Sequence, residues 1–199
     1  MAGQCNADCA CLCYGSAVYT AKDFLDMNRR DLAHALVSGH PIDPAALDDT
    51  QYRGISLGLP RFIERLSWKT FRKVFHRDPA TGSLRGWNVR LQQHGLDAPS
   101  VPMLRRGRPF TFGHFQVISP EGRPMPLGDY RGLLIDYGLA PHAPFDVTRF
   151  LRDPIVALNP GSVDLLLGFS YLEIGPWRFA TRSFFTLELE GPLEGPPPA

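Results

Sequence analysis

Four cysteines stand close together near the start of the chain, in the stretch CNADCACLCYG, and the sequence contains no others. They are Cys5, Cys9, Cys11 and Cys13. Four thiolates complete a tetrahedral site for zinc or copper(I), both of which accept sulfur ligands. The spacing C-x3-C-x-C-x-C differs from that of common zinc fingers, so a terminus with reactive thiols is the alternative. A disulfide is disfavoured because a single intervening residue makes a strained ring.

A second group of chemically capable residues lies on predicted strands. In FTFGHFQVIS, His114 and Gln116 share one strand face with Phe112. If that face lines a barrel, these groups orient a mostly apolar ligand. The alternative is the opposite parity, with His114 facing solvent, or a core histidine with satisfied hydrogen bonds.

Arg182 shares its predicted strand face with Phe184. An arginine among apolar neighbours holds a carboxylate ligand through two hydrogen bonds, whereas a surface pair with Glu173 or Glu188 is the simpler reading. The residues expected to line a ligand site are Trp87, Phe112, His114, Gln116, Tyr137, Phe184 and Arg182.

The second half of the chain has the two-residue periodicity of half-buried strands. Trp87, Val89 and Leu91 alternate with polar residues, and apolar stretches follow at 110–119 and 131–138. Further strands are expected at DPIVAL, 164–175 and 178–191. About six to eight mostly antiparallel strands result, and closure into a barrel hides their edges.

Two helices are expected before these strands. Residues 21–37 place apolar side chains on one helical face, with Thr20 as N-cap and Gly39 beyond the end. Residues 61–77 carry Arg or Lys at every fourth position beside apolar rows, which predicts a basic amphipathic helix whose last turn is alternatively a strand. Such a helix either covers the barrel or makes peripheral contact with an anionic membrane.

Composition favours one folded domain. The 199 residues are 44% hydrophobic, and the 21 basic and 20 acidic residues give a net charge of +1, which argues against nucleic-acid binding. We expect a Cys-rich segment at 1–19, one helix-plus-barrel domain at 20–191 and a flexible Pro/Gly tail at 192–199. The start lacks the pattern of a secretory leader, so a cytoplasmic location is expected.

Several stretches together resemble the GXWXG family and its companion domain of unknown function. These stretches are HPIDPAALDDTQYRG, RLSWKTF, DPIVALNPGSVDLLLG and SFFTLELE. The resemblance implies a mainly β (α+β) protein, an antiparallel lipocalin-like β-barrel with one or two N-terminal amphipathic helices. It implies no catalytic residue.

The function predicted from these observations is non-catalytic binding of a small hydrophobic or amphipathic molecule in the barrel. One alternative is a cofactor-independent isomerase or cyclase that uses the same cavity, with His114 as the proton-transfer group. Another is a metal-handling or protein-interaction module built on the cysteine cluster. No P-loop and no dinucleotide fingerprint is present in the sequence. The oligomeric state is left open.

Overall fold

The chain folds into a closed antiparallel β-barrel, as the computed structural model shows for residues 18–57, 69–141 and 146–195, which are those the structure describes. The strand order around the barrel is β1-β10-β9-β8-β7-β6-β3-β2. The strands are β1 Thr50–Leu57, β2 Thr70–Arg77, β3 Leu84–Arg90, β6 Thr111–Ile118, β7 Leu133–Asp136, β8 Leu151–Ala157, β9 Leu165–Ile174 and β10 Trp177–Pro192. The predicted mainly β class and antiparallel lipocalin-like barrel are confirmed.

Short helices and a small hairpin complete the fold beside the barrel strands. The helices are η1 Ala21–Phe24, α1 Arg29–Ser38, η2 Pro44–Leu47, η3 Tyr137–Leu139 and η4 Val147–Phe150. The hairpin consists of β4 Leu104–Arg105 and β5 Arg108–Pro109 and forms a separate two-stranded sheet.

The barrel interior is one of two large apolar cores. Its fully buried members include Tyr52, Phe75, Phe115, Ile135 and Phe185, each from a different strand. They alternate along the strands with residues that face outward, as the two-residue period of a strand requires.

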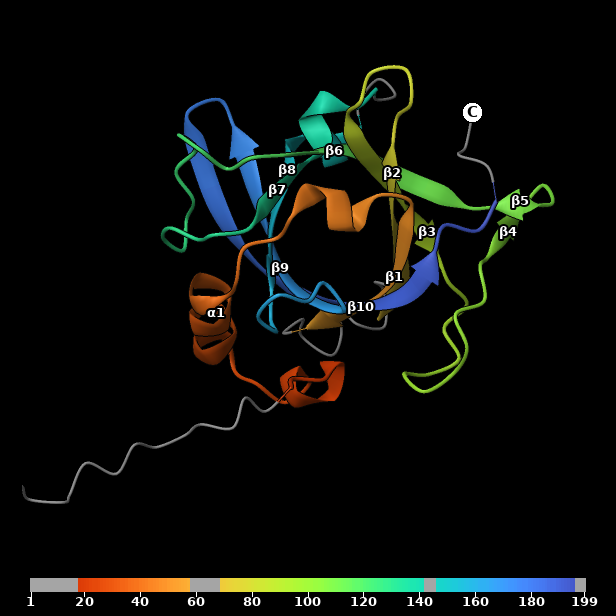
Figure 1. Cartoon of the computed structure of the whole chain (residues 1–199), viewed down its shortest axis with the longest axis horizontal. Coiled ribbons are helices and arrows are strands. Elements are labelled where there is room, and N and C mark those ends of the chain that lie inside the picture. The colour runs from red at the N-terminus through yellow and green to blue at the C-terminus, as the bar shows by residue number, and fades with distance from the viewer. Residues whose placement is uncertain (1–17, 58–68, 142–145, 196–199) are drawn as a thin grey trace, which may run out of the picture.

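The second core lies between the outer face of the wall and α1. It joins Leu32 and Leu36 of α1 to Leu167, Phe169 and Phe184 of β9 and β10. Figure 1 shows α1 outside the wall beside β9. Because this part of the wall is covered on both sides, β9 and β10 are apolar on both faces.

One end of the barrel is covered by η2, which follows α1 and precedes β1. Figure 1 shows this orange coil lying across the barrel. Leu47 of η2 is fully buried and belongs to the interior core, as does Ile42 just before it. The side chain of Asp43 accepts a hydrogen bond from Ala45 N and so starts the turn.

The single helix predicted over 21–37 is wrong in its first half. Thr20 precedes only the short η1, where the Asp23 carboxylate accepts a hydrogen bond from Thr20 N. α1 begins at Arg29, because the side chain of Asn28 accepts hydrogen bonds from Arg30 N and Asp31 N. Its end before Gly39 is as predicted.

Replacing Asn28 by alanine leaves two backbone N–H groups of α1 without their acceptor. We expect the free energy of unfolding to fall by about 1 kcal/mol, the usual value of such a cap. Urea denaturation followed by circular dichroism measures the change. Asn28→Ser, which keeps a capping oxygen, should be close to wild type; an equal loss in both variants would contradict the capping role.

The helix predicted over 61–77 is wrong for its second half. Thr70–Arg77 form β2, which pairs with β1 on one side and β3 on the other, as the alternative of a terminal strand anticipated. The four-residue spacing of cations also fits a strand, and barrel closure selects the strand because β2 then satisfies its backbone groups on both edges. Residues 61–68 lie outside the described residues. The membrane contact predicted for a continuous 61–77 helix therefore loses its basis.

The predicted tail at 192–199 starts too early. Pro192 is the last residue of β10, and Leu193 N donates a hydrogen bond to Asp49 O. In the part of the chain that the structure describes, no helix has the length and apolar character needed to cross a membrane.

Candidate functional site

A lysine lies inside the barrel. Lys73 stands on β2 between Phe71 and Phe75, on the face of the strand that points into the interior, and its register partner on β1 is the buried Tyr52. Only 1% of its side chain is exposed to solvent. A charged side chain in such surroundings needs hydrogen-bond or ion-pair partners to be stable.

Three further polar side chains surround the Lys73 ammonium. Lys73 Nζ donates a hydrogen bond of 2.8 Å to the Tyr137 hydroxyl and lies 3.4 Å from Asp153 Oδ2. The Tyr137 hydroxyl donates to the same Asp153 Oδ2 at 2.9 Å. Asn88 Nδ2 lies 3.4 Å from the Tyr137 hydroxyl and 3.1 Å from Gly113 O. We call Lys73, Asn88, Tyr137 and Asp153 the polar centre.

The polar centre has capacity for one more hydrogen-bonding group. Asp153 Oδ1 is buried and has no hydrogen-bond partner among the described residues. An ammonium carries three N–H groups, and two acceptors, Tyr137 Oη and Asp153 Oδ2, face Lys73 Nζ in this part of the chain. A buried carboxylate oxygen without a donor is costly, so a further hydrogen-bond donor at Asp153 Oδ1 would be favourable.

Aromatic rings enclose the Lys73 ammonium. Its Nζ lies 4.8 Å from the ring centre of Phe115, 5.2 Å from that of Phe185 and 5.9 Å from that of Phe71. Cations at these distances from a ring face are attracted by its quadrupole. The same rings give the site an apolar wall.

Glycines on neighbouring strands make room for these rings. Phe71 lies over Gly54, Phe115 over Gly86 and Phe185 over Gly168, each its direct register partner. A Cβ atom at any of the three glycines would collide with the ring. The glycines therefore let the rings lie flat on the barrel wall.

Tyr137 is held in the site by its neighbour in sequence. Asp136 points to the outside of the wall, where its carboxylate pairs with Arg123 at 2.8 Å and Arg152 at 3.1 Å. Asp136 Oδ1 also accepts a hydrogen bond from Gly138 N, which starts η3. Because successive residues point to opposite sides, anchoring Asp136 outside directs Tyr137 inward.

Burial shifts the proton equilibria of the polar centre. It lowers the pKa of the Lys73 ammonium, and the Asp153 carboxylate opposes part of this change. Burial and the same carboxylate raise the pKa of the Tyr137 phenol well above its usual value. The centre therefore combines an amine that loses its proton more readily than usual with a phenol that keeps it.

Among the predicted ligand residues, Tyr137 is the one that belongs to the polar centre. Trp87 is buried on the outside of the wall, where it packs with Val74 and Val89 and lies 6.4 Å from the His114 ring. The inward direction expected for Trp87 is therefore wrong. Leu193, beyond β10, covers this outer patch and keeps it from water.

His114 and Gln116 also point outward. His114 contacts Trp87 on the outer face, and Gln116 Nε2 donates to Leu139 O at the surface. Phe115, between them, fills the interior instead. The reversed parity contradicts the assignment of His114 as a proton-transfer group inside the barrel.

Of the remaining three predicted residues, Phe184 and Arg182 are not part of the polar centre, whereas Phe112 is the register partner of Asn88. Phe184 is fully buried in the outer core under α1, whereas its neighbour Phe185 faces the interior. Arg182 is exposed on β10. Phe112 is half-buried, with its ring centre 6.4 Å from that of Phe110, near the β4–β5 hairpin.

Lys73, Asn88 and Asp153 were missed as site residues. The available signal was the alternation Phe71, Lys73, Phe75, in which one cation sits between two aromatic residues on the same strand face. The helix predicted over 61–77 placed Lys73 on the face opposite Phe71 and Phe75 and so hid their alternation. Asn88 and Asp153 offer no comparable pattern, because each shares its strand with at least one arginine and so does not stand out from the polar residues of an ordinary strand.

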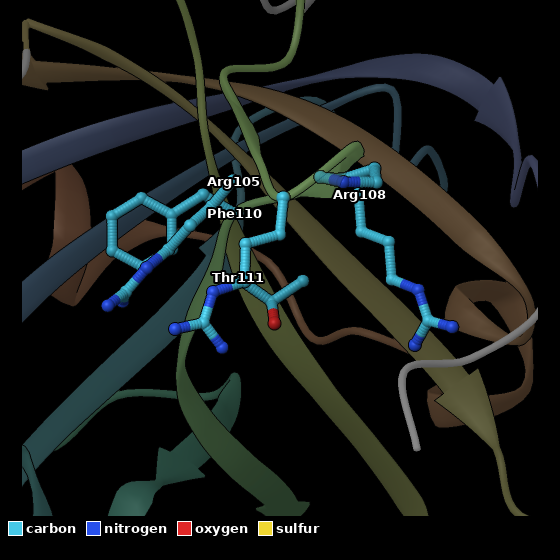
Figure 2. A pocket seen from close by; sticks show the side chains of 6 residues that line it. Arg105, Arg108, Phe110 and Thr111 are labelled. Atoms are coloured by element: carbon cyan, nitrogen blue, oxygen red, sulfur yellow. The ribbon is translucent and has the colours of Figure 1, made fainter.

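A second candidate lies on the surface, around the β4–β5 hairpin. An open pocket of about 540 Å³ is lined by Arg105, Arg106, Arg108, Phe110 and neighbouring residues. Figure 2 shows these side chains around the pocket. The Arg105 guanidinium lies 5.5 Å from the Phe110 ring centre. The three arginines take part in none of the ion pairs among the described residues, so the hairpin carries positive charge that no acidic side chain there balances.

The hairpin turn places an arginine in a strained conformation. Arg106 and Gly107 have φ of 54° and 76°, the left-handed values of a two-residue turn that favours Asn-Gly or Gly-Gly. We expect Arg106→Gly to raise the free energy of unfolding by roughly 0.5–1 kcal/mol, because glycine adopts this conformation without strain. Thermal unfolding measures the gain. Gly107→Ala is the matched control and should destabilise; no difference between the two variants would contradict the argument.

The cysteine cluster lies outside the described residues, so the zinc or copper(I) site at Cys5, Cys9, Cys11 and Cys13 stays a prediction. Within the described ranges, His, Cys, Asp and Glu side chains form no group of three that would hold a metal ion.

Comparison with known proteins adds no assignment. No family model, no curated protein and no solved structure matches this chain. The GXWXG resemblance therefore stays a prediction.

Proposed function

We propose that the barrel binds, in its interior, a small apolar molecule that carries one hydrogen-bonding group. The observation that carries this proposal is the polar centre, above all the unpartnered Asp153 Oδ1 beside Lys73. The surrounding Phe71, Phe115 and Phe185 rings suit the apolar part of such a ligand.

Stability alone does not account for these groups. Desolvation of a buried ion pair commonly costs as much as the attraction returns, and apolar residues of similar volume serve a core as well or better. Lys73 and Asp153 are 1% and 4% exposed, so both bear that cost. Binding a polar ligand group gives a reason for keeping them.

The free hydrogen-bonding positions indicate the chemistry of the ligand group. Asp153 Oδ1 accepts a hydrogen bond, whereas the third N–H of the Lys73 ammonium donates one. A hydroxyl or a protonated carboxyl group offers both a donor and an acceptor, whereas a hydrocarbon offers neither. We therefore expect an alcohol or fatty acid to bind better than an alkane of the same length.

Binding requires some interior packing to yield. The rings of Phe75, Phe115 and Tyr137 contact one another with centres 5.7 Å and 5.6 Å apart. Four pockets formed by described residues lie outside the barrel. A ligand that reaches Lys73 must displace part of this packing, and the free energy of binding has to cover that cost.

The test is native mass spectrometry of freshly purified protein, followed by thermal unfolding with decanol, decanoic acid and decane. We expect a co-purified small molecule or a higher melting temperature with decanol or decanoic acid, and a smaller effect of decane. Binding at 100 times the dissociation constant stabilises by about 2.7 kcal/mol, which a melting curve resolves.

The double variant Lys73→Met/Asp153→Leu removes the polar centre's charges and keeps its volume, so it should lose the preference for decanol over decane. Lys22→Met is the matched control, since the Lys22 side chain is 80% exposed and pairs with Asp97 at the surface. Absence of any bound species and of any ligand effect on wild-type protein would overturn the proposal.

A second candidate function is acid–base catalysis, the isomerase or cyclase alternative, now centred on Lys73, Tyr137 and Asp153 in place of His114. It is supported by the hydrogen-bonded chain from Lys73 through Tyr137 to Asp153, which suits proton transfer. Incorporation of solvent deuterium into a bound ligand would distinguish catalysis from simple binding.

The metal-handling alternative rests on the cysteine cluster alone. Zinc or copper(I) binding under reducing conditions, compared with a variant that lacks residues 1–13, tests it. The cytoplasmic location likewise rests on the sequence.

A further inference from the structure

Lysine is rare in this chain, and its one buried occurrence stands at the polar centre. Of 21 basic residues, three are lysines: Lys22, Lys69 and Lys73. The other 18, by subtraction, are arginines. Lys22 is 80% exposed and pairs with Asp97 at the surface, and Lys69 is half-buried at the edge of β2. Lys73 alone of the three is closed off from solvent.

Arginine would be the better residue for a purely structural ion pair at this place. Its planar guanidinium binds a carboxylate through two hydrogen bonds and is less strongly hydrated than an ammonium. Arginine cannot lose its proton in a protein, whereas a desolvated lysine can, and the neutral amine is a nucleophile. A chain that uses arginine at most cationic positions but lysine here retains, inside the barrel, a cation that can form a covalent bond.

We propose that Lys73 forms a reversible imine with an aldehyde or ketone group on the ligand of the barrel. The inference rests on the proposed ligand-binding function and narrows its ligand to a carbonyl compound with an apolar chain. Lys73 Nζ, the unpartnered Asp153 Oδ1 and the Tyr137 hydroxyl would all face the reacting group.

The chemistry balances without any oxidant or reductant. The Lys73 ammonium first gives one proton to Asp153. The neutral nitrogen then attacks the carbonyl carbon, a C–N bond forms, and the π pair moves to the oxygen, which takes a proton. That proton comes from the nitrogen, relayed by the Tyr137 hydroxyl, and gives a carbinolamine. Next Asp153 returns its proton to the hydroxyl oxygen, the C–O bond breaks with loss of water, and the nitrogen lone pair closes the C=N bond, which leaves a protonated imine paired with the Asp153 carboxylate. Addition of water reverses every step.

The surroundings of Lys73 suit this reaction. Burial lowers the pKa of the ammonium, which raises the fraction of neutral amine at a given pH. Asp153 lies 3.4 Å from Nζ to accept the proton, and Tyr137, 2.8 Å from Nζ, is a phenol that stays protonated and can donate to the carbonyl oxygen. The Phe115 and Phe185 rings exclude water, which otherwise hydrolyses the imine.

The experiment is reductive trapping on the full-length protein. Wild-type protein is incubated with decanal and sodium cyanoborohydride, its intact mass is measured, and the modified residue is located by peptide mapping. We expect one decyl group, located on Lys73, with Lys22 and Lys69 labelled more slowly, because burial lowers the pKa of the Lys73 ammonium and the aromatic rings protect its imine from water. Lys73→Met should lose this label, whereas Lys22→Met should keep it.

The outcomes separate this inference from the proposed function. Labelling confined to Lys22, Lys69 or the terminal amine would overturn the imine, and if decanol still raised the melting temperature, ligand binding would stand. If none of decanal, decanol and decanoic acid affected the wild-type protein, both would fail. The wild-type peptide map decides the site even if Lys73→Met does not fold.

Discussion

Replacing Asp153 by leucine, or Lys73 by methionine, should lower the free energy of unfolding by about 3–5 kcal/mol at pH 7, because either change leaves one buried charge without its partner. The two groups lie 3.4 Å apart and are 4% and 1% exposed, so solvent does not compensate for the loss. Urea denaturation followed by tryptophan fluorescence measures the effect. Each single variant should unfold at a clearly lower urea concentration than wild type.

The double variant Lys73→Met/Asp153→Leu should regain most of this stability and come within about 2 kcal/mol of wild type; the remainder is the Tyr137 hydroxyl, which loses its acceptor. Adding Tyr137→Phe to the double variant should reduce this remaining loss of unfolding free energy. The exposed pair Lys22 and Asp97 is the matched control, and its removal should change stability by less than about 0.5 kcal/mol. A double variant that loses the sum of both single losses would mean that the pair stabilises the barrel and would remove the energetic argument for a ligand.

The barrel itself was predictable because its strands carry their own signals. Alternation at 84–90 and the apolar stretches that became β6, β8, β9 and β10 each indicate a strand without knowledge of the others. Turn residues such as Gly175 and Pro176 separate them. Many short strands with edges to hide then lead to closure by a physical argument alone.

β2 was not predictable in the same way. Its eight residues satisfy a four-residue period through their cations and a two-residue period through Phe71, Lys73 and Phe75. Local propensity does not decide between these readings. Pairing with both β1 and β3 decides it, and that pairing is a tertiary effect.

The facing of individual side chains depends on features that the sequence pattern does not reveal. Between Gly86 and Asn88 the register of β3 with β6 shifts, and Gly113 adopts a φ of 52° there. Such an irregularity reverses the parity expected along β6, which is how His114 came to face outward. In β10 both Phe184 and Phe185 are buried, because α1 covers the outer face, so alternation does not tell which one faces the interior.

The polar centre was hard to predict both because β2 resembles a helix in sequence and because side-chain directions along β3 and β6 are irregular. Its four residues come from β2, β3, the end of β7 and β8, and closure of the barrel is what brings them within hydrogen-bonding distance. Tyr137 was predicted to point inward from its own alternation, and that direction is confirmed. The residues that contact Tyr137 are set by the order of the strands around the barrel, and the sequence pattern does not reveal that order.

Raising the pH above 10 should unfold the protein steeply, because four phenols are held protonated by the folded state. The pKa values of Tyr52, Tyr130, Tyr137 and Tyr171 are all raised above the usual 10.0, with burial as the main cause. In the unfolded chain these phenols ionise above pH 10, so the unfolded state binds fewer protons. Each then removes about 1.4 kcal/mol of stability per pH unit for as long as it stays protonated in the folded state, so the four together remove at most roughly 5 kcal/mol per unit. A domain of ordinary stability should unfold between about pH 11 and 12.

Lys73 affects the pH dependence of stability in the opposite direction. Burial lowers its pKa in the folded state, so the unfolded chain, in which the lysine keeps its usual pKa of 10.5, binds more protons below that pH. Stability therefore rises through the alkaline range below 10 because of Lys73 and falls above it because of the phenols. During an alkaline titration, the phenolate absorbance of four of the six tyrosines should appear at the pH at which the circular dichroism spectrum changes. Tyr137→Phe should reduce the slope above pH 10 by about 1.4 kcal/mol per unit, and Lys73→Met should abolish the rise below it. The chain has six tyrosines, so ionisation of more than two of them near pH 10 while the circular dichroism spectrum stays unchanged would show that the four buried phenols ionise in the folded barrel. The enclosed character of the polar centre would then be wrong.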